Sequence, residues 1–261
     1  MADFTSWRSY CQFSASVMRQ WRYARDETSI AFLEAVTSSC ESRTEHISSG
    51  TPLWRAQEGC NWRPEFYEGE HITDVPAPLD PERMKPLRDQ ASEGRANPKG
   101  IPFLYTTTHK ETAIAEVRPW IGAFVTVAIF TVQRPLRIVN CTFKDSKLPL
   151  FYLEEPTPAE TEAANWRAID EAFSRPVTVS DRFADYVPTQ ILAEEFRRHG
   201  FDGLAYHSSL GAGHNIAIFD PNSVEVSNSR VCRVGSLSIV AEDVTGPYQR
   251  NLSWSQTKSI Q

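Results

Sequence analysis

The sequence predicts an α+β fold, because helix-type and strand-type patterns both occur along the chain. The first fifty residues carry apolar side chains near helical spacing, residues 123–132 alternate as a strand does, and Thr157-Pro158-Ala159-Glu160 combines a capping box with proline at the first helical position. The 261 residues are 41% hydrophobic and 23% charged, which is ordinary globular usage. A chain of this length forms one large domain or two small ones.

The charge balance argues against nucleic acid as a partner. With 27 basic and 33 acidic residues the formal net charge is −6, so no chain-wide positive field would attract a polyanion. We therefore expect small ligands and no direct contact with nucleic acid.

The cysteines and the N-terminus indicate a cytoplasmic protein. Five cysteines are scattered without a C-x-x-C pair or a histidine spacing typical of zinc, which favours reduced thiols and no metal site. The N-terminus lacks the basic and apolar regions of a signal peptide, and no run of eighteen apolar residues occurs. We expect no membrane association.

Residues 1–50 are predicted to form a helical extension. Apolar residues recur near helical spacing, and Asp26 or Thr28 could cap the second helix. We expect the aromatic residues of this segment to pack on the body that follows, and a partner-binding helix pair is the alternative. Residues 38–50 are polar and are interpreted as a linker.

Residues 53–56 are predicted to form a strand that carries Arg55. A charged residue in a strand must face solvent, a counter-charge or an anionic ligand, because burying it unpaired is costly. Residues 60–92 are rich in charged residues and proline, and we interpret them as an irregular surface insertion that could act as a lid.

The stretch from Gly94 to Pro119 is predicted to form a loop, a short strand over residues 103–106 and a short helix. Thr108 with Glu111 matches a capping box, and Pro119 would end the helix near Arg118. Glu116 lies near the edge of the helix's apolar face, so its carboxylate is either solvated or directed into a cleft. The nearby tyrosine and arginine favour the cleft.

The remaining elements are predicted in order. Strands are expected over residues 123–132 and 136–139, and helices from residue 157 to about 175 and from about 188 to 199. Two short strands then flank a loop rich in Ser, Gly and His at residues 208–214, which is either a plain hairpin connection or a place where backbone approaches a ligand. A last strand is expected over residues 236–240, before a polar tail.

Taken together, three separated motifs resemble the RES domain. They are Gly-Arg-x-Asn-Pro-x-Gly-x-Pro-x-x-Tyr at residues 94–105, Thr-Ala-x-Ala-Glu-Val-Arg at 112–118, and Tyr-x-Ser-Ser-x-x-x-Gly-x-Asn-x-Ala-x-Phe at 206–219, after an arginine on the first strand. The resemblance covers residues 51–226, between the extension at 1–50 and a C-terminal strand and polar tail at 227–261.

The resemblance implies a fold similar to ADP-ribosyltransferases, with a central split β-sheet and surrounding helices. It also implies a toxin that cleaves the nicotinamide N-glycosidic bond of NAD by hydrolysis or phosphorolysis, with inorganic phosphate as co-substrate in the second case. The matching catalytic residues are Glu116, Tyr105, Arg55 and Ser208. The NAD-binding residues are Arg55, Arg95, Tyr105, Ser208, Ser209 and Asn215, and Ser208 and Ser209 are alternatives for the family's serine. No cofactor beyond NAD as substrate is implied.

Chemistry assigns a role to each residue type. A carboxylate at Glu116 would stabilise the oxocarbenium-like ribose, and Arg55 and Arg95 would hold the diphosphate with paired donors. Ser208 would add a hydroxyl hydrogen bond, and Tyr105 a flat face and a phenol.

The chain departs from the usual family pattern at Ala96, where many members have an aromatic residue, and at Leu210, where a basic residue is frequent. These departures and the added helices leave a non-catalytic NAD- or partner-binding module as an alternative, and the implied fold leaves a protein mono-ADP-ribosyltransferase as another. The toxin interpretation predicts an Xre-like helix-turn-helix antitoxin as partner. The N-terminal helices or the 60–92 insertion could cover the cleft, bind the antitoxin or support a homo-oligomer.

Overall fold

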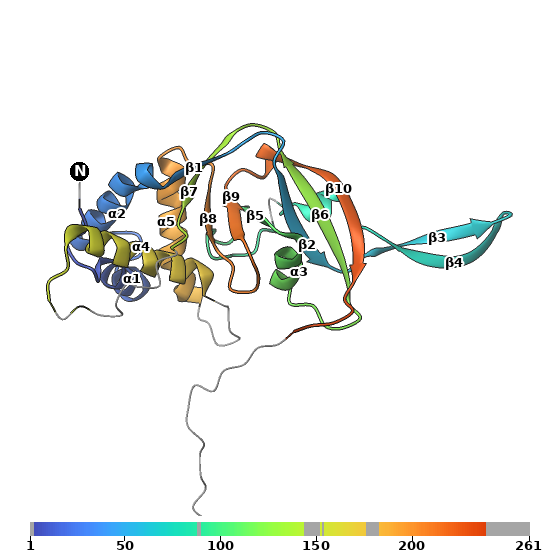
Figure 1. Cartoon of the computed structure of the whole chain (residues 1–261), viewed down its shortest axis with the longest axis horizontal. Helices are drawn as coiled ribbons and strands as arrows, with labels where there is room; N and C mark the ends of the chain where they lie inside the picture. The colour runs from blue at the N-terminus through green and yellow to red at the C-terminus, as the bar shows by residue number, and fades with distance from the viewer. Residues whose placement is uncertain (1–2, 88–89, 144–151, 153, 176–182, 239–261) are drawn as a thin grey trace, which may run out of the picture.

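The structure is a computed structural model, which describes residues 3–87, 90–143, 152, 154–175 and 183–238 (Figure 1). Its main elements, in chain order, are α1 (Ser9–Arg19), α2 (Glu27–Ser39), β1 (Thr44–Ile47), β2 (Pro52–Glu58), β3 (Asn61–Tyr67), β4 (Glu70–Ala77), β5 (Leu104–Thr107), α3 (Lys110–Glu116), β6 (Phe124–Val132), β7 (Leu136–Asn140), α4 (Pro158–Ser174), α5 (Val187–Arg198), β8 (Gly203–His207), β9 (His214–Ile218) and β10 (Val224–Arg233). Short 3₁₀ turns follow α2, β4 and β9 and precede α5. The α+β class is confirmed.

One eight-stranded mixed sheet organises the molecule, with strand order β1-β7-β8-β9-β5-β2-β6-β10. Only β7 and β8 run parallel; the other neighbouring pairs are antiparallel. The pairing is weakest in the middle, where Trp54 of β2 opposite Thr107 of β5 is the single registered pair. The sheet thus opens between β5 and β2, and side chains of both strands become accessible there.

Helices cover the two halves of the sheet unequally (Figure 1). Helices α1, α2, α4 and α5 pack together beside β8, around a core that includes Phe13, Phe32, Trp166 and Phe196. The short helix α3 instead packs against β2, β5 and β6, where Ala113 meets a smaller apolar cluster. The opening between β5 and β2 therefore lies beside α3.

The N-terminal helices are as predicted. Asp26 caps α2 by accepting a hydrogen bond from the Ser29 backbone N–H over 2.7 Å. Phe13 and Phe32 are buried and their rings stack with centroids 4.6 Å apart. The expectation that the aromatics of this segment are core is confirmed for these two residues and is wrong for Trp21, which follows the end of α1 and is 55% exposed.

The two long helices of the main body are also as predicted. Thr157 and Glu160 form both hydrogen bonds of the capping box that starts α4. The helix ends at Ser174, and the proline expected to close it, at position 176, lies outside the described residues. Local sequence signals are sufficient at these places because a cap involves residues only three positions apart.

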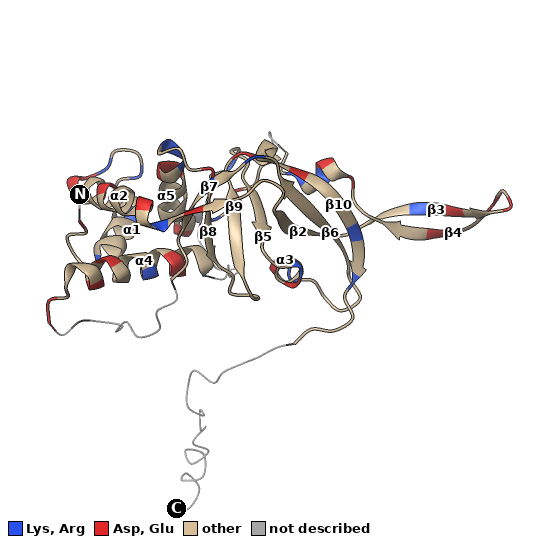
Figure 2. Cartoon of the chain, turned by 45° about the horizontal axis from the view of Figure 1, so that its top comes forward, with Lys and Arg blue, Asp and Glu red and all other residues tan. Residues whose placement is uncertain are grey.

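The interpretation of residues 60–92 as an irregular surface insertion is wrong for residues 61–77, which are exposed but form regular strands. Strands β3 and β4 form a two-stranded antiparallel hairpin that projects from the body (Figures 1 and 2). Most of its side chains are exposed, so no core imposes an alternation that the sequence could display. Proline at positions 64 and 76 further weakened the strand signal. Figure 2 shows acidic residues at its far end.

The strands at both edges of the sheet differ from the prediction. The supposed linker at residues 38–50 contains β1, which pairs with β7. The long strand β10 ends at Arg233, and residues 236–238 form no strand, whereas 239 and 240 lie outside the described residues. The C-terminal strand was thus placed too late, because the polar, half-exposed β10 lacks a clear alternation.

The predicted capping box at Thr108 is wrong as well. His109 is the N-cap of α3, and no side chain bonds its first turn. The Thr108 hydroxyl is instead a partner of the His214 backbone N–H, at 3.0 Å. Helix α3 also ends earlier than expected, at Glu116 rather than near Arg118. The Thr108 hydroxyl thus bonds the distant strand β9 instead of capping the helix that follows it.

Candidate active site

A cavity of about 350 Å³ lies where β5 and β2 separate, beside α3. Its wall combines charged, aromatic and small residues from seven separate stretches of the chain. They are Trp54, Arg55, Ala56, Glu93, Gly94, Arg95, Tyr105, Thr106, Thr107, Ala113, Glu116, Val117, Tyr186, Tyr206 and Asn215. Cavities of this size hold small ligands or parts of larger ones.

Glu116 is the last residue of α3 and is held by two hydrogen bonds to one of its oxygens. Its Oε1 accepts from Ser208 Oγ at 2.8 Å and from Asn215 Nδ2 at 2.6 Å. Its Oε2 accepts no hydrogen bond from a described residue. A carboxylate at a helix C-terminus opposes the helix dipole, and these two donors offset that cost. One oxygen is fixed by the protein while the other remains available to a ligand.

The loop after β8 brings Ser208, and not Ser209, to Glu116. Ser209 is exposed and its hydroxyl bonds no described residue. The loop is fastened to α3, because Thr112 Oγ1 donates to the Ala212 carbonyl at 2.6 Å. Gly213 has φ +80°, and a side chain there would overlap the His109 ring. The structure therefore separates two serines that the sequence left as alternatives.

Arg55 lies on β2 and its guanidinium is fixed within the cavity wall. Its Nη1 donates to the Tyr105 carbonyl at 2.9 Å, across the opening between the strands. Its Nε is fully buried and has no hydrogen-bond partner in the described structure. Burial lowers the pKa of Arg55, although guanidinium stays protonated in proteins. The group keeps its positive charge and part of its donor capacity.

Arg95 comes from the loop before β5. Its Nη1 donates to the Phe173 carbonyl near the end of α4. The loop backbone is anchored too, since Gln190 Nε2 donates to the carbonyls of Gly94 at 2.9 Å and Asn97 at 3.1 Å. Neither Arg95 nor Arg55 forms an ion pair with a carboxylate among the described residues. Two guanidinium groups without a counter-charge thus line the same cavity.

The Tyr105 hydroxyl holds the arginine loop together. It donates to Asn97 Oδ1 at 2.7 Å and accepts from the Ala96 backbone N–H at 2.9 Å. Burial raises the pKa of Tyr105, so the phenol stays neutral. Asn97 completes the loop by donating to the Ser92 carbonyl at 2.9 Å and the Ile101 carbonyl at 2.8 Å. The Tyr105 hydroxyl is used within the loop, so the face of its aromatic ring is the part left for a ligand.

Sequence reasoning missed several residues of the wall. Tyr206 is 5% exposed, and burial raises the pKa of its hydroxyl, as do Tyr105 and Glu116. Trp54, Glu93 and Tyr186 also line the cavity. Tyr206 of the wall and Asn97 of the arginine loop both belong to the motifs that resemble the RES domain, and that position in a motif is the sequence signal that could have identified them. No local sequence pattern indicated that Trp54, Glu93 or Tyr186 would line a cavity.

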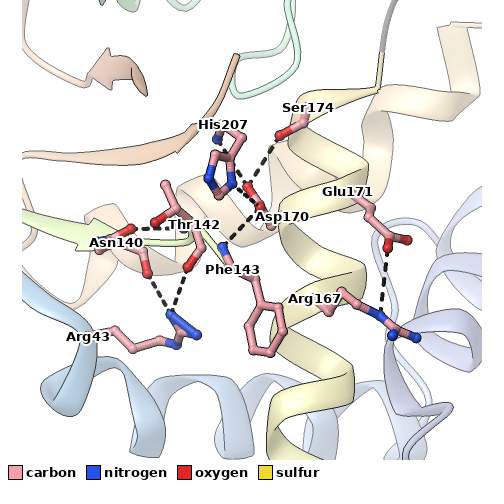
Figure 3. Close-up of polar contacts among 9 residues, drawn as sticks. All are labelled: Arg43, Asn140, Thr142, Phe143, Arg167, Asp170, Glu171, Ser174 and His207. Atoms are coloured by element: carbon pink, nitrogen blue, oxygen red, sulfur yellow. Dashed lines mark hydrogen bonds and ion pairs between the residues drawn. The ribbon is translucent and has the colours of Figure 1, made fainter. Parts of the chain in front are cut away.

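A polar network around Asp170 joins α4 to the end of β8 (Figure 3). The buried carboxylate of Asp170 accepts from the Phe143 backbone N–H at 3.0 Å and from Ser174 Oγ at 3.2 Å. It also bonds the His207 backbone N–H at 3.1 Å and His207 Nδ1 at 2.5 Å. Asp170 therefore fixes the end of β8 one residue before Ser208.

Within the described ranges, no group of three or more His, Cys, Asp or Glu side chains is arranged to hold a metal ion. All five cysteines are free thiols. In the same ranges, no helix is both long and apolar enough to cross a membrane.

Comparison with known proteins identifies one family. The model of the RES domain matches residues 52–238. No curated protein sequence matches the chain. Among solved structures, the MbcT–MbcA toxin–antitoxin complex of M. tuberculosis contains a chain with 13% sequence identity and a TM-score of 0.38, over 76% of this chain and 92% of that one. That structural likeness is too low to bear on fold or function.

Proposed function

The chain belongs to the RES-domain family, and from this membership we propose that it is a toxin enzyme that cleaves the nicotinamide N-glycosidic bond of NAD. The observation that carries the proposal is the arrangement of Glu116 with Arg55 and Arg95 around one cavity. The carboxylate has one fixed and one available oxygen, and neither guanidinium group pairs with a carboxylate in the described part of the chain. This combination suits a ligand that pairs a diphosphate with a centre of developing positive charge.

In this proposal the two arginines bind the diphosphate. Guanidinium groups donate paired hydrogen bonds to phosphate oxygens, and their contacts with the Tyr105 and Phe173 carbonyls orient them without neutralising their charge. The unpartnered Nε of Arg55 supports the same role, because a buried donor without a partner is costly unless a ligand supplies one. The rings of Tyr105, Tyr206 and Trp54 offer flat apolar surface for the nicotinamide and the sugars.

Glu116 acts on the bond that breaks. The bond between C1′ of the ribose and the nicotinamide nitrogen breaks, and its electron pair leaves with nicotinamide. The sugar becomes oxocarbenium-like, and Glu116 Oε2 stabilises its positive charge while Ser208 and Asn215 hold Oε1 in place. An oxygen of water or inorganic phosphate then bonds to C1′. Water gives ADP-ribose and releases a proton, whereas phosphate gives ADP-ribose-1-phosphate.

The finer expectations from the family belong to the same proposal. The single registered pair between β5 and β2 is compatible with the split sheet of ADP-ribosyltransferases. An enzyme that depletes NAD endangers the cell that makes it, so we further propose an Xre-like antitoxin that blocks the cavity in the cytoplasm. These statements rest on the family and on the cavity described above.

Product analysis by mass spectrometry tests the proposal. The purified chain is incubated with NAD, with and without phosphate, beside Glu116→Gln and the matched control Glu111→Gln, whose carboxylate is exposed on the same helix. We expect nicotinamide release by the wild type and the control, and a loss of about 100- to 1000-fold in Glu116→Gln.

The products distinguish the acceptors. ADP-ribose indicates hydrolysis, and ADP-ribose-1-phosphate that forms only with phosphate indicates phosphorolysis. Intact NAD in every wild-type reaction would contradict the proposal. Adenine-labelled NAD that labels a protein instead would indicate mono-ADP-ribosyl transfer.

A further inference from the structure

Glu93 is a second acidic residue of the cavity wall, beside Glu116. It is partly buried and lines the cavity together with Arg55 and Arg95. Its carboxylate forms no hydrogen bond or ion pair with a described residue. A carboxylate in the same wall as two guanidinium groups is a natural ion-pair partner for them. Here the arginines are bonded to backbone carbonyls instead.

The backbone that carries Glu93 is held firmly. The next residue, Gly94, donates its N–H to the Asn97 carbonyl at 2.9 Å, and its own carbonyl accepts from Gln190. The Tyr105 hydroxyl closes the same loop. Glu93 is therefore presented to the cavity by an ordered segment, which favours a role toward a ligand over that of a mobile surface residue.

Glu93 and Glu116 enter the cavity wall from different elements, the arginine loop and the end of α3. Glu116 is tied to Asn215, which pairs with Thr107 in the sheet. The loop of Glu93 also carries Arg95, two residues later, and its backbone is tied to the Tyr105 hydroxyl. Arg55 and Arg95 belong to the same wall. A dinucleotide with its reacting ribose at Glu116 and its diphosphate at the arginines would extend its other ribose toward Glu93.

We propose that Glu93 binds the hydroxyls of the adenosine ribose and excludes a 2′-phosphate, so that the enzyme acts on NAD and not on NADP. The inference rests on the proposed function, of which it specifies the substrate class. A carboxylate accepts hydrogen bonds from vicinal ribose hydroxyls, as acidic residues do in other dinucleotide sites. A 2′-phosphate brings negative charge to the same place, and like charges in a partly buried site repel strongly.

The experiment compares kcat/KM for NAD and NADP in the wild type, Glu93→Gln, Glu93→Arg and the control Glu111→Gln. Equilibrium binding of both nucleotides is measured in parallel. We expect the wild type and the control to prefer NAD by at least about 30-fold, an effect of the size of one unfavourable charge contact. Glu93→Gln should reduce that ratio by about 10-fold, mainly through KM for NADP, and Glu93→Arg should reduce it further or reverse it.

The outcomes separate this inference from the proposed function. Equal use of NAD and NADP by the wild type, or a ratio that neither variant changes, overturns the role of Glu93 and leaves NAD cleavage standing. If no nucleotide is consumed but the wild type binds NAD in preference to NADP and Glu93→Arg loses that preference, the inference holds and the proposed reaction fails. If neither nucleotide binds, both fail. Circular dichroism confirms that each variant is folded.

Discussion

Ser208 Oγ donates a hydrogen bond to Glu116 Oε1 over 2.8 Å and so joins the loop after β8 to the end of α3. The two residues are 92 positions apart in the chain. The hydroxyl also accepts from the Leu210 backbone N–H at 3.1 Å, which fixes its orientation. The serine thus acts on the carboxylate, and through it on a ligand.

Replacing Ser208 should impair the enzyme, whereas replacing its neighbour should not. Ser208→Ala removes a hydrogen bond to a charged group, worth about 1.5–3 kcal/mol, so we expect kcat/KM for NAD to fall about 10- to 100-fold. Ser209→Ala removes an exposed hydroxyl and should leave the rate unchanged. Steady-state assays of nicotinamide release measure both variants. Equal losses of kcat/KM in the two variants would contradict the assignment of Ser208 as the serine that contacts Glu116.

Gly94 has no room for a side chain. A Cβ at this position would lie 2.5 Å from the Tyr105 hydroxyl and 2.8 Å from Asn97 Oδ1. We expect Gly94→Ala to lower the free energy of unfolding by about 1–3 kcal/mol, because the arginine loop must shift. Gly235→Ala is the matched control, since a Cβ there meets nothing within 4 Å. Urea unfolding measures both, and comparable stabilities of the two variants would contradict the close contact.

Asp170 should matter for stability far more than its neighbour Glu171. Asp170→Asn replaces an acceptor of four hydrogen bonds with a side chain that directs an amide N–H toward donors, and we expect a loss of about 3 kcal/mol. Glu171 is 70% exposed and meets Arg167 at 3.7 Å, so Glu171→Gln should change stability by less than about 0.5 kcal/mol (Figure 3). Chemical unfolding at pH 7 measures both. Similar effects would mean that the Asp170 network contributes little.

The contribution of Asp202 should disappear in acid. Burial raises its pKa, but hydrogen bonds from Arg134 Nη2 at 2.6 Å and the Arg137 N–H at 2.8 Å outweigh burial and hold the pKa below the ordinary 3.8. Because the folded state favours the ionised form, its stabilisation is present above the unfolded pKa and is lost as pH falls through the folded pKa. Asp202→Asn should therefore cost about 1 kcal/mol at neutral pH and progressively less below about pH 4. Unfolding curves of both proteins over this range measure the difference, and a cost that does not vary with pH would exclude the ionised carboxylate as its source.

Elements of this chain that depend on residues close in sequence were predicted correctly, and those that depend on residues far apart in sequence were not. The cap of α4 was predicted because Thr157 and Glu160 are three residues apart and bond each other. The cap expected at Thr108 failed for the opposite reason, because a backbone group of the distant strand β9 takes its hydroxyl. The β3–β4 hairpin was missed because its exposed strands bury no face and so show no periodic pattern.

The sequence by itself determined the α+β class, most of the helices and central strands, and the motifs that indicate the RES family, because propensity, capping and motif order are properties of neighbouring residues. Only the tertiary structure decided that Ser208 rather than Ser209 contacts Glu116, that the Tyr105 hydroxyl holds a loop, and that Glu93 shares a cavity with two arginines. These relationships join residues on separate strands and loops. Their geometry depends on how the sheet opens between β5 and β2, and no local pattern encodes that opening.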